Sequence, residues 1–425
     1  MLELWFDFSC PYAYLASLQA PKLGVPITWR PMLLGGVFRG IGAGDGPMAT
    51  LSPPKAAHNA RDMHRWAELF GAPFQIPAAH PMRTVRALRV LLALPHSRWP
   101  EAIAAIFAAY WQSAEDVTRD DVISAALRGA GLPDEEITSA LGRADEDAIK
   151  HELRQRTDEA IGLGIFGAPA WVFRRPQGPL LLWGQDRLDW VRAVLAGWDP
   201  DAAAPPGGPR TIASAGTAPA GTTLDVYFDV ASPFAYLALT QLSALATSTG
   251  VTPRLVPILL GGLFRDIGQG DVPWFAMAPA KQRYVGLEMT RWARWWGVPF
   301  EQPRKFPQRT VTAQRLCLLA ATRGGDDGVR LALALGRAMW AEQRDLEAPV
   351  TLRELLTTNG FPATWLEEAS APEIKAALAA NTTAARDAQV FGVPTFVVNG
   401  KTLVWGQDRL DLVARALAGW EPEHG

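Results

Sequence analysis

Hydrophobic and polar positions alternate at the start of each half of the chain, as they do in a short β-strand. The alternation covers LELWF at 2–6 and LDVYF at 224–228. Pro11 and Pro233 each open an apolar segment with helical spacing, where proline is favoured because the first turn of a helix needs no N–H. The pattern then predicts a second strand in each half, ITWRPML at 27–33 and PRLVPIL at 253–259.

The middle of each half is rich in Ala, Leu, Arg and Glu, with apolar residues at helical spacing. It predicts four or more helices over about 48–160 and again over about 274–388. The pattern then returns to β-structure in PAWVF and LLLWG, and in PTFVV and TLVWG, before an amphipathic helix closes each half. The order is therefore βαβ, a helical block, and ββα, and it occurs twice.

The halves also repeat their motifs, which indicates gene duplication. FGAPAWVF at 166–173 matches FGVPTFVV at 391–398, and the offset ranges only from 222 (Cys10 to Ser232) to 226 (Lys55 to Lys281). We expect one module over 1–198 and another over 224–422. Residues 199–223 are rich in Pro, Gly, Ala and Thr, which predicts a flexible linker that lets the modules associate in many geometries.

Composition excludes several classes of partner. The chain has 425 residues, a net charge of -2 and no clustered basic excess, so no nucleic-acid partner is expected. No apolar run is long enough for a membrane helix, and MLELWFDFSC is not a signal peptide. Cys10 and Cys317 form no CxxC motif, which favours the reducing cytoplasm, and Cys317 lies on an apolar helical face that we expect to be buried. No metal-binding motif is present.

The combination of SCPYAYLA or SPFAYLA near the start of a module with FGxP and WGQDRL near its end is specific. On these motifs the chain resembles the 2-hydroxychromene-2-carboxylate isomerase family, in the DsbA-like, kappa-class glutathione transferase group. The resemblance covers nearly everything outside the linker. It implies an α/β fold of two thioredoxin-like domains, each with an inserted all-helical domain. It also implies glutathione as the cofactor and paired modules, here as an intramolecular pseudo-dimer in a monomeric chain.

The resemblance implies a catalytic serine at the start of the first helix, beside the glutathione sulfur. Ser232 holds this position in the second module and Cys10 holds it in the first. Ala13 and Ala235 replace the second cysteine of a dithiol motif, which excludes a dithiol mechanism. The helix dipole is expected to lower the pKa of Cys10. The alternatives are a simple N-cap for Ser232 and an inert small residue for Cys10.

Further cofactor-binding residues occur as matched pairs. The resemblance implies that Pro169 and Pro394 are cis prolines facing the active site, and that the backbone of Ala168 or Val393 pairs with the cysteinyl part of glutathione. A trans proline opening a strand is the alternative.

WGQDR precedes the last helix of each module. The resemblance implies that Asp186 and Asp408 meet the γ-glutamyl ammonium, with added hydrogen bonds from Gln185 and Gln407. The two aspartates are also placed to cap that helix.

Lys55 and Lys281 match in register, and the resemblance implies that they lie near the carboxylates of glutathione and substrate. An ordinary solvated lysine is the alternative. The modules depart from the family pattern at a position where an Asn is usual, and they differ from each other at two more. These are Asp45 and Asp271, His58 against Tyr284, and His80-Pro81 against Phe306-Pro307.

Three functions remain open on the sequence. The first is a glutathione-dependent isomerase or transferase acting on an aromatic or conjugated small-molecule acid. The second is a monothiol glutathione-linked oxidoreductase that uses Cys10. The third is a non-catalytic binding module or scaffold in one or both halves.

Overall fold

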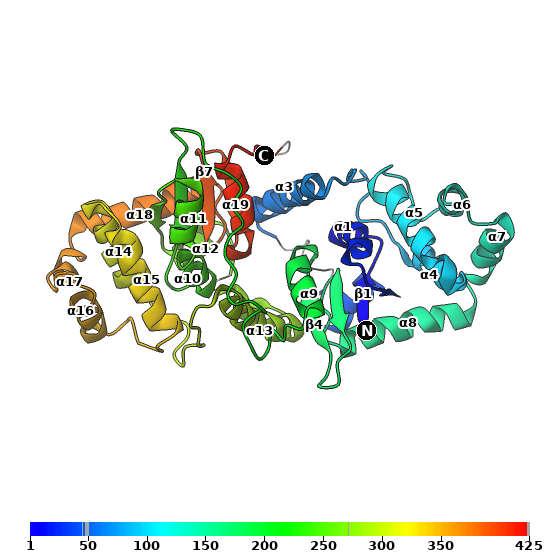
Figure 1. Ribbon diagram of the computed structural model, residues 1–425, viewed down its shortest axis with the longest axis horizontal. Helices are drawn as coiled ribbons and strands as arrows, with labels where there is room; N and C mark the ends of the chain where they lie inside the picture. The colour runs from blue at the N-terminus through cyan, green and yellow to red at the C-terminus, as the bar shows by residue number, and fades with distance from the viewer. Residues whose placement is uncertain (45, 47–50, 271, 423–425) are drawn as a thin grey trace.

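The chain forms two four-stranded sheets, one in each half (Figure 1). The computed structural model describes residues 1–44, 46, 51–270 and 272–422. The first sheet module contains β1 (Leu2–Phe6), α1 (Pro11–Gln19), β2 (Ile27–Pro31), β3 (Ala170–Phe173), β4 (Leu180–Trp183) and α9 (Leu188–Leu195). The second contains β5 (Leu224–Phe228), α10 (Pro233–Leu239), α11 (Leu242–Thr249), β6 (Arg254–Pro257), β7 (Thr395–Val398), β8 (Thr402–Trp405) and α19 (Leu410–Leu417).

The strand order is the same in both sheets, β2-β1-β3-β4 and β6-β5-β7-β8. The first two strands of each module pair in parallel and the other pairs are antiparallel. This is the thioredoxin arrangement, so the predicted α/β fold with two thioredoxin-like domains is confirmed.

An all-helical block is inserted between the second and third strands of each module, as predicted. In the first module the helices are α2 (Leu34–Gly40), α3 (Pro53–Phe70), α4 (Val85–Ala93), α5 (Trp99–Trp111), α6 (Asp120–Gly129), α7 (Asp134–Arg143) and α8 (Asp147–Gly162). In the second they are α12 (Leu260–Asp266), α13 (Pro279–Trp296), α14 (Val311–Arg323), α15 (Asp327–Trp340), α16 (Pro349–Thr358), α17 (Trp365–Glu368) and α18 (Pro372–Asp387).

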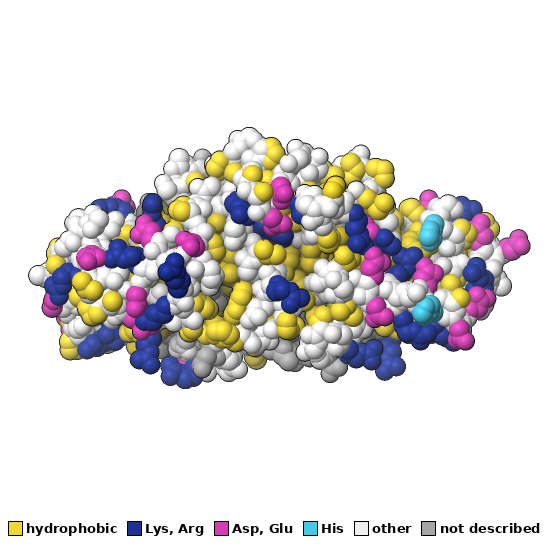
Figure 2. All heavy atoms as spheres, turned by 90° about the horizontal axis from the view of Figure 1, so that it is seen from below, with side chains coloured by type: hydrophobic (Ala, Val, Ile, Leu, Met, Phe, Trp, Pro, Cys, Tyr) yellow, Lys and Arg dark blue, Asp and Glu magenta, His cyan; other side chains and the backbone are white. Residues whose placement is uncertain are grey.

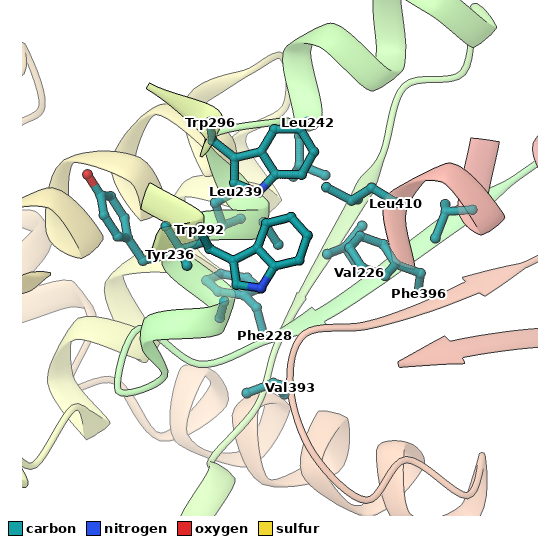
Figure 3. Close-up of a cluster of buried hydrophobic side chains, with 14 of the residues drawn as sticks. Val226, Phe228, Tyr236, Leu239, Leu242, Trp292, Trp296, Val393, Phe396 and Leu410 are labelled. Atoms are coloured by element: carbon teal, nitrogen blue, oxygen red, sulfur yellow. The ribbon is translucent and has the colours of Figure 1, made fainter. Parts of the chain in front are cut away.

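Buried apolar side chains fill the space between sheet and helices. In the second module, Phe228 and Phe396 of the sheet pack with Leu239 of α10 and with Trp292 and Trp296 of α13 (Figure 3). Cys317 is 1% exposed within this core, as expected. The alternating strand positions thus form the core of each module. No helix in the described ranges is both long and apolar enough to cross a membrane.

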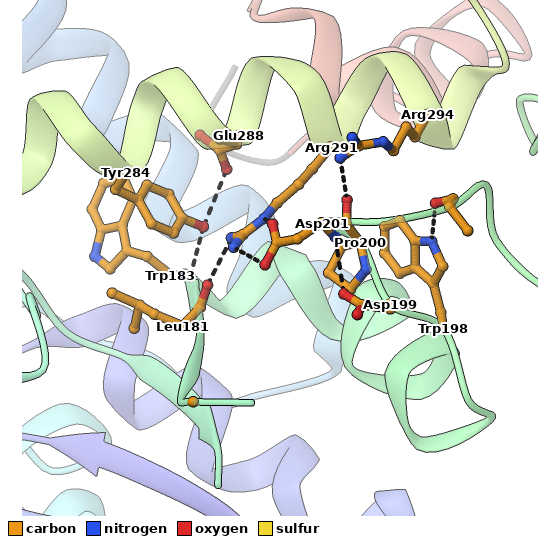
Figure 4. A network of polar contacts seen from close by, with 12 residues as sticks. Leu181, Trp183, Trp198, Asp199, Pro200, Asp201, Tyr284, Glu288, Arg291 and Arg294 are labelled. Atoms are coloured by element: carbon orange, nitrogen blue, oxygen red, sulfur yellow. Dashed lines mark hydrogen bonds and ion pairs between the residues drawn. The ribbon is translucent and has the colours of Figure 1, made fainter. Parts of the chain in front are cut away.

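The long helices α3 and α13 each cross to the other module (Figure 1). Arg65 of α3 donates from Nη1 to the carbonyl of Leu403 on β8, at 2.7 Å. Arg291 of α13 donates in the same way to the carbonyl of Leu181 on β4, at 2.9 Å (Figure 4). Both β4 and β8 are edge strands, so each module covers an unpaired edge of the other. The expected intramolecular pair is therefore present.

Residues 199–223 differ from the expected free linker. Asp201 binds Arg291 at 2.7 Å, and Arg294 donates to the carbonyl of Pro200 at 2.9 Å (Figure 4). Further along, Ile212 is 7% exposed. The segment has no apolar period, but these anchors are enough to hold it against the second module. It therefore constrains the relative placement of the modules.

Charged side chains concentrate toward the two ends of the elongated molecule, whereas hydrophobic ones are more evident in the middle (Figure 2). The ends carry the helical blocks and the middle carries the sheets (Figure 1).

Candidate active site

A buried aspartate fixes the turn that leads from the first strand of each module into its first helix. The Asp7 carboxylate accepts hydrogen bonds from the N–H of Ser9 at 3.0 Å, from the N–H of Leu34 at 2.8 Å and from the Thr84 hydroxyl. Burial raises the pKa of Asp7. The carboxylate ties the turn to the starts of α2 and α4.

Asp229 repeats this arrangement in the second module. Its carboxylate accepts from the N–H groups of Ala231 and Leu260, both at 2.9 Å, and from the Thr310 hydroxyl at 2.8 Å. The candidate catalytic position follows three residues later in each module. Its N–H donates to the backbone carbonyl of the same aspartate, at 3.1 Å for Cys10 and 3.0 Å for Ser232.

Ser232 lies at the start of the first helix of its module, as predicted, and is the N-cap of α10. Its Oγ accepts from the N–H of Ala235 at 3.2 Å and donates to the carbonyl of Val393 at 3.3 Å. The side chain is 6% exposed. Capping and contact with the Val393 segment thus occur together, and the hydroxyl proton points to the residue before Pro394.

Cys10 occupies the equivalent N-cap of α1, and its Sγ lies 3.1 Å from the carbonyl oxygen of Ala168. The expected lowering of its pKa is wrong. Burial raises the pKa of Cys10 to about 12, with a further small contribution from Asp7, and outweighs the favourable backbone N–H groups of Ala13 and Tyr12. The thiol is 7% exposed, and the cost of removing its thiolate from water exceeds the stabilisation that the N-terminus of the helix gives to that thiolate.

The Ala168-Pro169 and Val393-Pro394 peptide bonds are both cis, as predicted. The glycine before each of these dipeptides leaves room for a tryptophan. A Cβ on Gly167 would lie 2.7 Å from Trp183 Nε1. In the second module a Cβ on Gly392 would lie 2.9 Å from Trp405 Nε1. Each indole N–H is buried and has no hydrogen-bond partner among the described residues.

The two candidate lysines cross between modules. Lys55 of α3 places its Nζ 5.2 Å from the ring centre of Trp405, and Lys281 of α13 places its Nζ 5.6 Å from that of Trp183. Neither lysine forms an ion pair within the described ranges. Burial, with repulsion from Lys281, lowers the pKa of Lys55 to about 8, and burial also lowers that of Lys281. Lys55 therefore belongs with Ser232, and Lys281 with Cys10.

His58 and Tyr284 cross in the same way, one helical turn after the lysines. Tyr284 packs on Phe166 at 5.2 Å between ring centres, and its hydroxyl accepts from the N–H of Trp183 at 2.9 Å (Figure 4). His58 packs on Phe391 at 5.2 Å, but its buried Nδ1 has no partner in the described structure. Burial lowers the pKa of His58 to about 3, so its imidazole is neutral. The two sites therefore differ in polarity at one equivalent position.

Asp186 and Asp408 do not cap the last helices, whose N-caps are Arg187 and Arg409. Asp186 instead pairs with Arg187 at 3.0 Å and with Arg409 at 2.6 Å. Asp408 pairs with the same two arginines, at 2.7 and 3.0 Å. Two guanidinium groups at this distance attract the carboxylates more strongly than the helix ends do.

Two acids from the crossing helices complete this buried cluster. Glu288 of α13 accepts from Arg187 at 2.9 Å, and Asp62 of α3 lies 3.7 Å from Arg409. Burial raises the pKa of both acids. None of Arg187, Arg409, Asp62 and Glu288 was among the residues predicted from the sequence. The arginines stand inside the repeated WGQDR motif, which is a usable signal, but the acids carry no motif.

The two glutamines also differ. Gln407 accepts from the indole N–H of Trp296 at 2.9 Å, so its amide oxygen already has a partner in its own module. Gln185 is 3% exposed, and Phe70 stands where the second module has Trp296. Asp45 and Asp271 lie outside the described residues.

Each site thus offers a donor set that suits an anionic peptide. A lysine without an ion pair can meet a carboxylate, and an aspartate can meet an ammonium group. No group of three His, Cys, Asp or Glu side chains suited to a metal ion occurs in the part of the chain that the structure describes.

Comparison with known proteins gives one consistent group. The family model of the DSBA-like thioredoxin domain matches residues 1–196 and again 223–418. The chain is 26% identical over 208 residues to glutathione S-transferase kappa 1 of Rattus norvegicus, covering 46% of this chain and 90% of that protein. It is 30% identical over 200 residues to 2-hydroxychromene-2-carboxylate isomerase of Pseudomonas putida, covering 46% and 93%.

A solved structure of a 2-hydroxychromene-2-carboxylate isomerase is also similar. It is 24% identical, covers 46% of this chain and 94% of its own, and has a TM-score of 0.40. Each match thus spans less than half of this chain and nearly all of the other protein.

Proposed function

Because the chain belongs to the DSBA-like thioredoxin domain family, in the group of 2-hydroxychromene-2-carboxylate isomerases and kappa-class glutathione transferases, we propose that it is a glutathione-dependent enzyme. Its substrate is an aromatic or otherwise conjugated small acid, and its reaction is an isomerisation or a transfer. Glutathione, when bound, supplies a thiolate that can add to a conjugated carbon and leave again after rotation about the bond.

The main support for the proposal is a series of neighbouring contacts in the second site. The Ser232 hydroxyl meets the carbonyl of Val393, the adjoining Gly392 meets the Trp405 indole, and the Lys55 ammonium lies over that indole. These contacts follow one another from Ser232 to Lys55 and draw on both modules. A series of this kind suits an extended peptide such as glutathione.

Each residue then has a separate task. Ser232 donates a hydrogen bond to an anionic sulfur, which stabilises the thiolate. The backbone at Val393 and Pro394 positions the cysteinyl part. Lys55 attracts a carboxylate of cofactor or substrate, and Asp408, with Gln407 beside it, binds the γ-glutamyl ammonium. In the first site the corresponding residues are Ala168, Pro169, Lys281, Gln185 and Asp186.

We propose that the first module binds glutathione but does not catalyse the reaction of the substrate. Cys10 is buried, and the raised pKa keeps it a neutral thiol at physiological pH. A neutral thiol is a poor nucleophile and a weak hydrogen-bond donor. This reading is favoured over a monothiol oxidoreductase that uses Cys10, which requires a thiolate. We place the enzyme in the cytoplasm, where free thiols persist.

The test uses the full chain with glutathione and 2-hydroxychromene-2-carboxylate. We expect Ser232→Ala to reduce turnover at least tenfold and Cys10→Ala to leave it nearly unchanged. Calorimetric titration with S-methylglutathione is expected to report two sites per chain. Turnover that survives Ser232→Ala contradicts the catalytic role of Ser232. Absence of any binding contradicts the whole proposal.

A further inference from the structure

A cavity of about 280 Å³ lies between α2, α4 and α8 of the first module. Four cationic side chains line it, Arg39, Arg89, Lys150 and Arg154, against a single acid, Asp158. Its lining includes none of Cys10, Pro169 and Trp183, which belong to the first thiol site. The cavity is thus a separate and strongly cationic feature.

The charge of these side chains is only partly neutralised. Arg89 lies 3.3 Å from Asp145, which is 66% exposed, and Lys150 lies 3.4 Å from Asp147, which is 99% exposed. Ion pairs with solvated acids of this kind are weak, and neither acid lines the cavity. Arg39 and Arg154 form no ion pair with any described residue. The cavity therefore keeps an excess of positive charge.

Arg89 also carries a donor that nothing uses. Its Nε is buried and has no hydrogen-bond partner among the described residues, and the Nε of Arg315 in the second module is in the same state. A buried N–H without a partner costs free energy unless an acceptor arrives. The planar guanidinium fork matches the two oxygens of a carboxylate.

Apolar side chains form another part of the lining. Leu33, Val85 and Leu153 form walls beside the cations. A purely inorganic anion gains nothing from such walls, whereas a small ring with a carboxylate uses both surfaces. A volume of about 280 Å³ suits a ligand of that size.

Three of the cations recur in the second module. The Thr157 hydroxyl accepts from the N–H of Leu33, and the Thr382 hydroxyl accepts from the N–H of Leu259. These equivalent hydrogen bonds show which residues of α8 and α18 correspond. In this register Arg39, Arg89 and Lys150 correspond to Arg265, Arg315 and Lys375, whereas Arg154 and Asp158 correspond to Ala379 and Thr383. The second copy thus has one cation and one acid fewer, and the formal charge of its corresponding side chains is the same.

We infer that the cleft between α2, α4 and α8 is a binding site for a small aromatic carboxylate, distinct from the two thiol sites. It extends the chemistry of the molecule beyond the proposed glutathione sites and does not depend on them. Asp7 links the cleft to the active-site turn, because its carboxylate holds both the first N–H of α2 and the Thr84 hydroxyl next to Val85.

The test is a ligand-observed NMR titration of the full chain with benzoate and, in parallel, with inorganic phosphate. We expect benzoate to bind more tightly than phosphate. We expect Arg89→Gln and Arg154→Ala each to weaken benzoate binding at least tenfold. Lys281→Ala, which alters the thiol site, and Arg83→Ala, an exposed cation near the start of α4, are expected to leave it unchanged.

Arg154 is exposed, so its replacement keeps the test valid if Arg89→Gln disturbs folding. Ala379→Arg adds the missing cation to the second module and is expected to raise the number of benzoate molecules bound per chain. The inference is overturned if the wild-type chain binds no benzoate, if phosphate binds more tightly, or if Lys281→Ala abolishes benzoate binding while Arg154→Ala does not change it.

Discussion

Cys10 and Ser232 occupy the same backbone position, yet burial acts differently on a thiol and on a hydroxyl. The Ser232 hydroxyl is neutral and forms two hydrogen bonds in the buried site. The thiolate form of Cys10 is destabilised there, because burial removes the water that would solvate its charge. With a pKa of about 12, Cys10 holds about one part in ten thousand of thiolate at pH 8. We therefore expect iodoacetamide to alkylate Cys10 slowly, at a rate that still rises with pH beyond pH 9.

Mass spectrometry of the alkylated peptide measures this rate. The Cys10→Ser variant gives the background from Cys317, and the urea-unfolded chain gives the rate of an unhindered thiol. A rate that levels off below pH 8 would mean that Cys10 is a thiolate in the folded protein, and would restore the monothiol oxidoreductase as the better function.

Lys55 gives the second site a predictable pH dependence. Its pKa of about 8 lies below the ordinary value for lysine, so its charge is lost as pH rises through 8. At pH 9 about a tenth of the side chain remains charged. If a carboxylate binds only the ammonium form, S-methylglutathione is expected to bind the second site up to tenfold more weakly at pH 9 than at pH 7.

Calorimetry in a Lys281→Ala background isolates this site. Because that change also removes the repulsion that helps to lower the pKa of Lys55, the fall in affinity is expected at a somewhat higher pH than in the parent chain. The matched control is Lys55→Arg, because a guanidinium stays charged over the whole range. We expect its affinity to fall only as far as the ligand's own ammonium group loses its proton, and therefore less steeply than that of the parent. A Lys55→Arg profile that falls as steeply as that of the parent would assign the titration to another group.

At the level of elements, the reciprocal crossing of α3 and α13 holds the modules together. Arg291 is 4% exposed and binds both Asp201 and the carbonyl of Leu181. Its removal leaves a buried edge-strand carbonyl without a donor. We expect Arg291→Met to lower the free energy of unfolding by about 2–4 kcal/mol. Arg283→Met, at an exposed position on the same helix, is expected to change it by less than about 0.5 kcal/mol.

Urea unfolding followed by tryptophan fluorescence measures both variants. Trp190 packs on Trp292, and Trp198 packs on Trp295, so tryptophans from both modules meet at the interface and contribute to the signal. Equal stability of the two variants would show that the covered edge of β4 contributes little to the association of the modules.

Local patterns predict local structure in this chain, and they succeed where the determinant lies within a few residues. The strands and the helix starts after Cys10 and Ser232 are of this kind, whereas the cis peptide bonds before Pro169 and Pro394 were predicted from the family resemblance. The helix α2 was not expected, because its LGG start is unfavourable alone. Packing against α8 stabilises it, and a Cβ on Gly40 would clash with Ile161.

Long-range placement could not be predicted in the same way. Nothing near Lys55 in the sequence shows that its ammonium lies over Trp405 of the other module. The same holds for the anchoring of residues 199–223, which depends on Arg291 far along the chain. Crossing contacts of this kind follow from the pairing of the modules, which a single repeated sequence does not specify.

The whole molecule is organised around a shared charge cluster. Within the described ranges the four acids of the cluster form ion pairs with two arginines alone, which leaves a formal excess of two negative charges in these pairs when every carboxylate is ionised. The acids are Asp62, Asp186, Glu288 and Asp408, and the arginines are Arg187 and Arg409. Burial opposes this by raising the pKa of Asp62 and Glu288. An ammonium group brought to each module would balance the excess. The cluster therefore suits two ligands better than none.

Because each arginine binds both Asp186 and Asp408, the two sites cannot respond independently. A ligand ammonium that takes Asp186 loosens its pairs with Arg187 and Arg409, and both arginines are then free to strengthen their hold on Asp408. We expect glutathione binding at the two sites to be negatively coupled, by about 1–3 kcal/mol.

Arg409→Met, although it lies in the second module, is expected to change affinity at both sites. Calorimetry on Arg409→Met combined with Lys55→Ala or Lys281→Ala reads one site at a time. If Arg409→Met alters only the site of its own module, the cluster holds the modules together without transmitting ligand binding between them.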